Sequence, residues 1–87
     1  MTVELEETSL CTVIEDALKT ASKSEALSEP VTMNSRMGSP REWDSLSFVA
    51  VFIAVSQAFD VDLDDDDAIH FQAVSPMYQF LDEILNE

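Results

Sequence analysis

Apolar residues recur at helical spacing near the start of the chain. Five of them follow the i, i+3, i+4, i+7 spacing of a single helix face: Leu10, Val13, Ile14, Ala17 and Leu18. Thr2 and Thr8 are alternative N-caps for this helix, and its end is expected near Ala21. The segment therefore predicts an amphipathic helix that buries one side.

A second and more apolar helix is predicted from residue 45 to Phe59. Asp44 is a favourable N-cap, and the helix-compatible pattern continues for about four turns. Every residue from Phe48 to Val55 is apolar, and these residues cannot all face the core of so short a chain. Such a helix either lies between neighbours on most sides or exposes an apolar strip to a partner. A buried strand over residues 48–55 is the competing interpretation, which the length of the pattern disfavours.

The C-terminal third predicts two further helical segments. An acidic connector, residues 60–67, precedes one short turn from Ala68 to Phe71. The last helix is expected to have Ser75 as N-cap and Pro76 at its first position. Its apolar face contains six residues: Met77, Tyr78, Phe80, Leu81, Ile84 and Leu85. Residues 1–87 thus predict a single all-α domain, a small bundle of three main helices and one short helix.

A long polar segment, residues 22–43, separates the first two helices. It is rich in Ser, Pro and Asn, which favour loops. A connection of this length in a compact domain is usually functional or held against the core. Four apolar residues are spaced through the segment and predict anchors that fold it back over the core: Leu27, Val31, Met33 and Met37.

Composition narrows the class of protein. The 87 residues suffice for one small domain, and a hydrophobic content of 46% disfavours disorder. Eighteen acids against four bases give a formal charge of −14, which disfavours nucleic acid and anionic membranes as partners and favours basic protein surfaces. Cys11 is the single cysteine, and residues 1–7 lack the basic start and apolar stretch of a signal peptide. We therefore expect a cytoplasmic monomer.

The tripeptide Asp44-Ser45-Leu46 opens the apolar helix directly after Trp43 and the long loop. At the first helical position, the Ser45 hydroxyl would lie near free backbone N–H groups and the positive end of the helix dipole, which favour a phosphate ester. The simpler alternative is that Asp44 and Ser45 only cap the helix. The tripeptide alone favours this simpler alternative.

A wider set of residues resembles the acyl carrier protein family. Besides Asp44-Ser45-Leu46, the match from residue 31 to residue 81 contains these features: Val31-Thr32, Val49, Val51, Phe59-Asp60, Leu63, Ala68, Val74 and Phe80-Leu81. The resemblance implies a four-helix carrier-protein bundle in which a phosphopantetheinyl transferase attaches 4′-phosphopantetheine from coenzyme A to Ser45. It also implies that Asp44 is the flanking acid and Leu46 an apolar recognition contact. The attached thiol then holds an acyl group as a thioester and presents it to acyl-loading and acyl-processing enzymes.

Three features depart from the family pattern. The residues Arg41-Glu42-Trp43 stand where the family usually has a glycine, and Trp43 would lie beside the attached arm. The second-helix positions expected to be exposed, typically acidic in the family, are uncharged: Ser47, Ala50, Ser56 and Gln57. The third departure is that the loop region carries all of the chain's basic residues.

These departures favour a dedicated or secondary pathway over housekeeping fatty-acid synthesis. We expect its enzymes to recognise Trp43, Phe48 and Val49 by apolar contact. Burial of Phe48 under the long loop is an equal alternative. The sequence does not separate an acyl carrier from an aminoacyl or peptidyl carrier, and the rival from another class is an unmodified acidic helical adaptor that binds a basic protein. With one His, one Cys and no glycine-rich loop, the chain lacks residues for catalysis of its own.

The acidic connector is a weak calcium-site candidate. Its first aspartates have the spacing of EF-hand ligands, but Asp65 replaces the required glycine and Phe71 the bidentate Glu. A solvated charge run is the better interpretation. His70, without a second His or Cys, predicts a capping or core-edge role, and Cys11 predicts a small, unreactive apolar side chain. We therefore expect no metal site.

Overall fold

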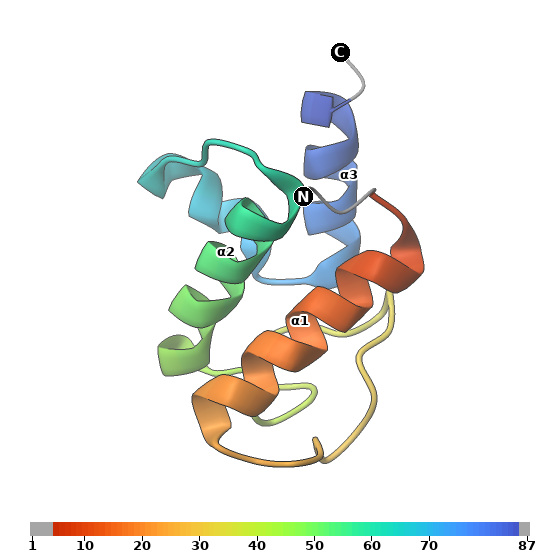
Figure 1. Ribbon diagram of the computed structural model, residues 1–87, viewed down its shortest axis with the longest axis vertical. Coiled ribbons are helices and arrows are strands. Elements are labelled where there is room, and N and C mark those ends of the chain that lie inside the picture. Colours follow the sequence, from red (N-terminus) through yellow and green to blue (C-terminus); the bar gives the residue numbers. More distant parts are fainter. Residues whose placement is uncertain (1–4, 86–87) are drawn as a thin grey trace.

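The structure is a computed structural model that describes residues 5–85, and these fold into four helical elements (Figure 1). They are α1 (Glu7–Ser22), α2 (Ser45–Phe59), the 3-10 helix η1 (Asp65–Phe71) and α3 (Val74–Leu85). The all-α prediction is confirmed, and the strand alternative for residues 48–55 is wrong because these residues lie within α2. Within residues 5–85, no helix is long and apolar enough to cross a membrane.

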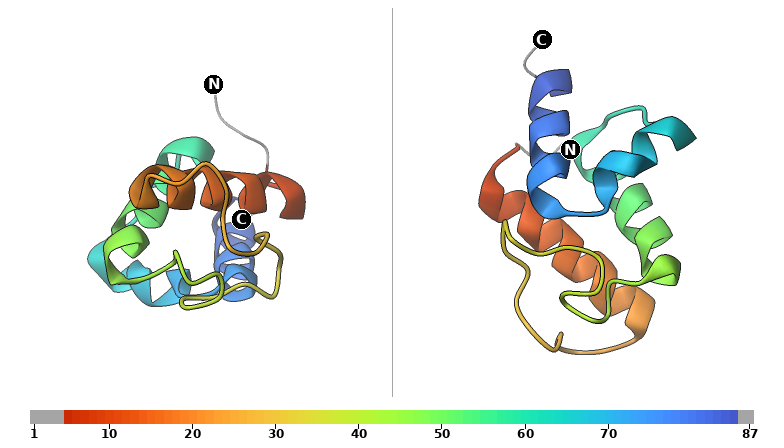
Figure 2. Two further views of the ribbon diagram at one scale, coloured as in Figure 1. Left: turned by 90° about the horizontal axis from the view of Figure 1, so that it is seen from below. Right: turned by 180° about the vertical axis from the view of Figure 1, so that it is seen from behind.

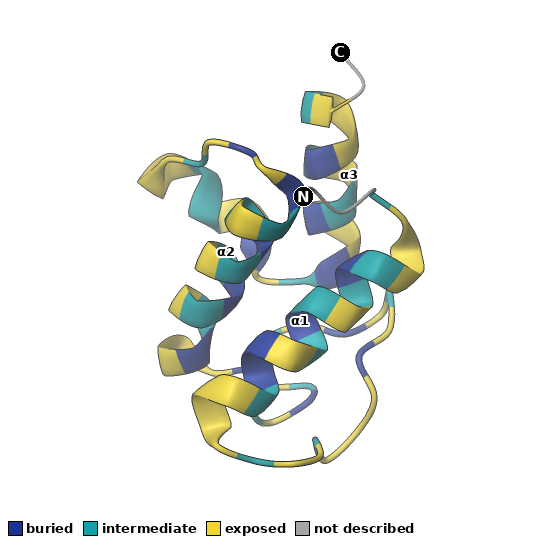
Figure 3. Ribbon diagram, in the orientation of Figure 1, coloured by how far each residue is buried: buried dark blue, intermediate teal, exposed yellow. Residues whose placement is uncertain are grey.

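The core lies where α1 packs against α2, with α3 and η1 closing it from the other side. The buried residues of α1 are four of the five that the spacing singles out: Leu10, Ile14, Ala17 and Leu18. Val51, Val55 and Phe59 are buried on α2, each one helical turn from the next. Figure 3 shows the consequence, a buried stripe along each helix and an exposed outer face. α2 is therefore not buried on all sides, although it is the most apolar helix.

Both ends of α2 match the prediction, whereas the ends of α1 and the start of α3 differ from it by a residue or two. Glu6, not Thr8, caps α1, because the Glu6 N–H donates to Ser9 Oγ at 2.9 Å. Thr8 lies inside the helix, and Thr2 lies outside the described residues. α3 begins at Val74, one residue before the predicted cap Ser75. Pro76 then falls in the first turn, where a missing N–H costs no intrahelical hydrogen bond.

The loop of residues 23–44 is held against the core, as its apolar residues predict. Val31 is buried, and three further side chains pack against the core: Leu27, Met33 and Met37. Two backbone hydrogen bonds tie the loop to the start of α3: Met37 N–H donates to Gln72 O at 2.9 Å, and Val74 N–H to Ser35 O at 3.0 Å. Figure 2 shows the loop passing α1 on the side that is hidden in Figure 1. The loop is thus part of the folded domain and delivers the chain to the start of α2.

The short helix η1 is longer than predicted and mostly exposed. It starts at Asp65 instead of Ala68, and at its start the Asp64 N–H donates to Asp67 Oδ2 at 2.9 Å. Phe71 is its buried residue, and its ring lies 5.0 Å from that of Phe52 on α2. The Phe71 ring also lies 6.1 Å from that of Phe80 on α3. Aromatic contacts to both α2 and α3 therefore hold the end of η1 to the bundle, while its acidic start faces water.

We predict that the melting temperature rises with ionic strength. Residues 42–87 contain eleven acids and no Lys or Arg, so their mutual repulsion destabilises the folded state. A thermal melt followed by circular dichroism at about 10 mM and about 500 mM salt should show an increase of several degrees. The double variant Asp62→Asn/Asp66→Asn, at two exposed positions, should melt higher at low salt and respond less to salt. A melting temperature independent of salt in the wild-type protein would contradict the prediction.

Candidate functional site

The N-terminus of α2 is held by a reciprocal pair of hydrogen bonds. Asp44 has extended backbone geometry, and its Oδ1 accepts from the N–H groups of Leu46 and Ser47, both at 3.0 Å. In return, Ser47 Oγ accepts from the Asp44 N–H at 2.8 Å. This arrangement confirms Asp44 as the N-cap. The pKa of the Asp44 carboxyl is lowered, mainly by the hydrogen bond from the Ser47 backbone, so the cap is ionised at neutral pH.

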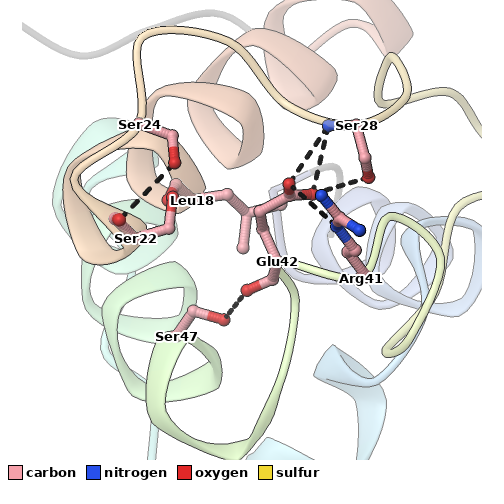
Figure 4. A network of polar contacts seen from close by, with 7 residues as sticks. All are labelled: Leu18, Ser22, Ser24, Ser28, Arg41, Glu42 and Ser47. Atoms are coloured by element: carbon pink, nitrogen blue, oxygen red, sulfur yellow. Dashed lines mark hydrogen bonds and ion pairs between the residues drawn. The ribbon is translucent and has the colours of Figure 1, made fainter.

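Glu42 connects this helix start to the long loop. Its carbonyl oxygen accepts from Ser47 Oγ at 2.6 Å, and its carboxylate accepts from the Ser28 N–H at 3.1 Å and from Ser28 Oγ at 2.8 Å (Figure 4). Arg41 Nε lies 3.8 Å from the same carboxylate. Desolvation alone would raise the pKa of Glu42, but hydrogen bonds from Ser28 and from the Glu42 backbone, together with the charge of Arg41, lower the pKa below its ordinary value. One residue thus fixes both the loop and the first turn of α2.

Ser45 is exposed at the first position of α2. Its side chain forms no hydrogen bond with any other residue between 5 and 85. Asp44 and Leu46 on either side are exposed as well, so the hydroxyl can be reached by an enzyme. One expectation needs correction: the Leu46 and Ser47 N–H groups are not free to bind a phosphate, because the Asp44 carboxylate occupies both.

Two residues that were expected at the surface, Ser47 and Trp43, are buried. Ser47 is 3% exposed, because its hydroxyl is used by the cap and by Glu42. Trp43 is fully buried, so it presents no surface to a partner, contrary to the expected recognition role. Its Nε1 has no hydrogen-bond partner among the described residues. The indole therefore serves as a core side chain beneath the helix start.

The exposed side of α2 carries a ridge of three large apolar side chains. Leu46 is 85% exposed, Val49 55% and Ile53 48%. We call these residues the α2 ridge. Leu46 and Val49 are among the predicted contact residues, but Ile53 is not, although the spacing of 46, 49 and 53 marks one helix face. Because α2 contains no charged residue, the helix surface that follows Ser45 is apolar, and the acid next to Ser45 is the cap residue Asp44.

Phe48 takes an intermediate position beside the ridge. It is half-buried and stacks on Phe52, with ring centroids 6.5 Å apart. The two rings border a hollow between α2 and η1 that is also lined by Val49, Asp65 and Ala68. Phe48 is thus packed beside η1 and retains an exposed edge next to Val49.

The remaining candidates occupy structural positions. His70 is exposed, and its ring stacks on that of the partly buried Phe80 with centroids 4.5 Å apart, so it lies on the surface against the edge of the core. Among residues 5–85, no group of three or more His, Cys, Asp or Glu side chains is arranged to hold a metal ion. Cys11 is half-buried against the core. Burial raises the pKa of its thiol, and the nearby Glu7 and Glu15 raise it further.

Comparisons of the chain with protein-family models, with curated proteins and with solved structures give no match. The function therefore has to be inferred from the site itself.

We predict that Glu42→Gln lowers stability at neutral pH and makes stability less dependent on pH. The pKa of Glu42 is lower in the folded state than its ordinary value of 4.5, so its stabilising effect is complete above about pH 4.5 and is lost as the pH falls through the folded pKa. Urea denaturation at about pH 7 and about pH 3 should show a larger loss for the variant at pH 7. Glu25→Gln, at an exposed position of the same loop, is the control. An equal loss at both pH values would refute the role of the Glu42 charge.

We also predict that Cys11 reacts slowly with thiol reagents in the folded protein. Because its pKa is raised, the reactive thiolate is scarce near neutral pH. The pH–rate profile with a disulfide reagent should have a higher midpoint in the folded protein than in urea. Glu15→Gln should lower the midpoint of the folded protein. Superimposable profiles in both states would show that burial and the two acids have no effect on the thiol.

Proposed function

We propose that the protein is an acyl carrier that bears 4′-phosphopantetheine on Ser45. The observation that carries the proposal is an exposed serine hydroxyl, free of hydrogen bonds to the described residues, at the first position of a firmly capped helix. A separate transferase would supply the catalytic base, so the carrier itself needs only an accessible hydroxyl. When attached, the group supplies a thiol that holds the cargo as a thioester.

The residues around Ser45 would hold the attachment point firmly and leave the attached group mobile. The helix dipole favours a phosphodiester at this position. The Asp44 carboxylate, however, already accepts from the Leu46 and Ser47 N–H groups, so neither of these two amides is free to anchor the phosphodiester. The hydrogen bonds of Asp44, Ser47 and Glu42 instead keep the attachment point itself rigid. A mobile arm on a rigid base suits cargo that must visit several enzymes.

The α2 ridge supports a carrier of a dedicated or secondary pathway. Partner enzymes that recognise an acidic helix would find no charge on α2. Enzymes with an apolar docking surface would instead contact Leu46, Val49 and the exposed edge of Phe48. Neither the ridge nor the cap separates acyl cargo from aminoacyl or peptidyl cargo, so loading assays with an acyl-transferring and an adenylating enzyme are the way to identify it.

An unmodified adaptor is the second candidate function. It is favoured by the same exposed ridge, which could bind a partner without any arm. The two functions differ in what Ser45 does: an adaptor would bind its partner equally well after Ser45→Ala, whereas a carrier would lose its cargo.

The test is incubation with coenzyme A and a broad-specificity phosphopantetheinyl transferase, followed by mass spectrometry. We expect the wild-type protein to gain one phosphopantetheinyl group and Ser45→Ala to gain none. Ser75→Ala, which removes an exposed serine from the first turn of α3, should still be modified. Under denaturing conditions the thiol count should rise from one, that of Cys11, to two. No gain in the wild-type protein, or a gain that persists in Ser45→Ala, would exclude the carrier function proposed for Ser45.

A further inference from the structure

A shallow open groove of about 460 Å³ runs between α1 and α2 on the surface of the bundle. Four of the nine residues that line it are alanines, Ala17 and Ala21 on α1 and Ala50 and Ala54 on α2. Ile53 of the α2 ridge forms part of its wall. Small side chains on two packed helices leave room for the side chains of a third helix. On α2 the groove extends from Ala50 to Gln57, about 10 Å or two helical turns.

The charges around the groove indicate what kind of surface it fits. α2 contributes no charge, and the acidic side chain that lines the groove is Asp16 of α1. On the other side of the ridge, the hollow beside Phe48 is lined by Asp65. The groove and the α2 ridge together form one apolar strip. Asp16 borders this strip on one side and Asp65 on the other. The complementary surface has apolar side chains in the middle and Lys or Arg at its edges.

A second copy of the chain does not have this chemistry. Each copy has a formal charge of −14, so two copies repel each other, and two copies that packed through this same strip would bring acids against acids at its borders. A small apolar ligand would leave much of its surface in water, because the groove is open rather than enclosed. A helix laid along the groove covers the whole strip at once.

We propose that the groove between α1 and α2 is the docking site of a basic amphipathic helix from a partner protein. Its apolar side chains contact the four groove alanines and Ile53, and a Lys or Arg side chain faces Asp16. This docking needs no arm on Ser45. It therefore goes beyond the proposed carrier function, and either proposal can fail without the other.

The experiment uses the full-length, unmodified protein labelled with ¹⁵N and a synthetic helical peptide of Leu and Lys, with Leu at the i, i+3, i+4 and i+7 positions. We expect chemical-shift changes centred on Ala50, Ile53 and Ala54. A peptide with the same lysines but with Ser in place of Leu should bind at least about tenfold more weakly. Ser45→Ala should bind the Leu/Lys peptide like the wild-type protein.

Two matched variants separate docking from general charge attraction. Ile53→Asp adds a negative charge, which by itself would attract the basic peptide, so a loss of affinity of about tenfold would show apolar contact at the groove. Leu85→Asp makes the same change at an exposed position of α3 and should retain wild-type affinity. Ile53→Gln, which changes no charge, gives the same comparison if Ile53→Asp is poorly folded. Asp16→Asn should weaken binding more than Asp66→Asn.

Three results would overturn the proposal. The first is equal binding of the Leu and Ser peptides, or shift changes centred on the acids of η1, because charge attraction alone would explain either one. The second is a concentration-dependent shift of the groove residues in the free protein that Ile53→Asp abolishes, which would make a second copy the occupant. The third is the absence of any binding by the Leu/Lys peptide at low salt.

Discussion

The hydrogen bonds at residues 42–47 are the constraint on which the rest of the structure depends. Asp44 and Ser47 each bond the backbone N–H of the other, which fixes the start of α2 at Ser45. Ser47 Oγ also donates to the Glu42 carbonyl, and this bond turns Ser47 towards the protein interior. Because Ser45 lies two residues earlier, about 200° around the helix, it must then point outwards. The burial of Ser47 and the exposure of Ser45 therefore have the same cause, the hydrogen bonds that Ser47 makes at the helix start.

Part of the fold could be predicted from residue types and their near neighbours alone. These local signals identify Asp44 as a cap, Phe59 as the last residue of α2 and Val31 as a loop anchor. They do not predict the burial of Ser47 and Trp43. A serine on an apolar helix is expected to face water, and its burial depends on the carbonyl of Glu42, whose place is set by the loop. Trp43 is likewise buried by how the loop folds back, which no local pattern encodes.

The exposed side of α2 could be predicted only in part, for the same reason. The run of apolar residues shows that some must be exposed, but not which ones, because that depends on the rotation of the helix. Once the cap fixes this rotation, Val51 and Val55 face the core and Val49 and Ile53 face water. The exposed ridge is thus a consequence of the cap and not a separate feature of the sequence.

The acidic side chains and the exposed apolar side chains lie on different helices, and this arrangement affects how a partner would bind. α2 carries no charge, whereas the acids lie on the elements beside it, α1 and η1. Charges at the border of a contact mainly change the rate and orientation of encounter, whereas buried apolar side chains contribute most of the affinity. For the basic helix proposed above, the two contributions would come from different helices. Substitutions on η1 would then alter how fast that helix arrives while leaving intact the surface proposed to retain it.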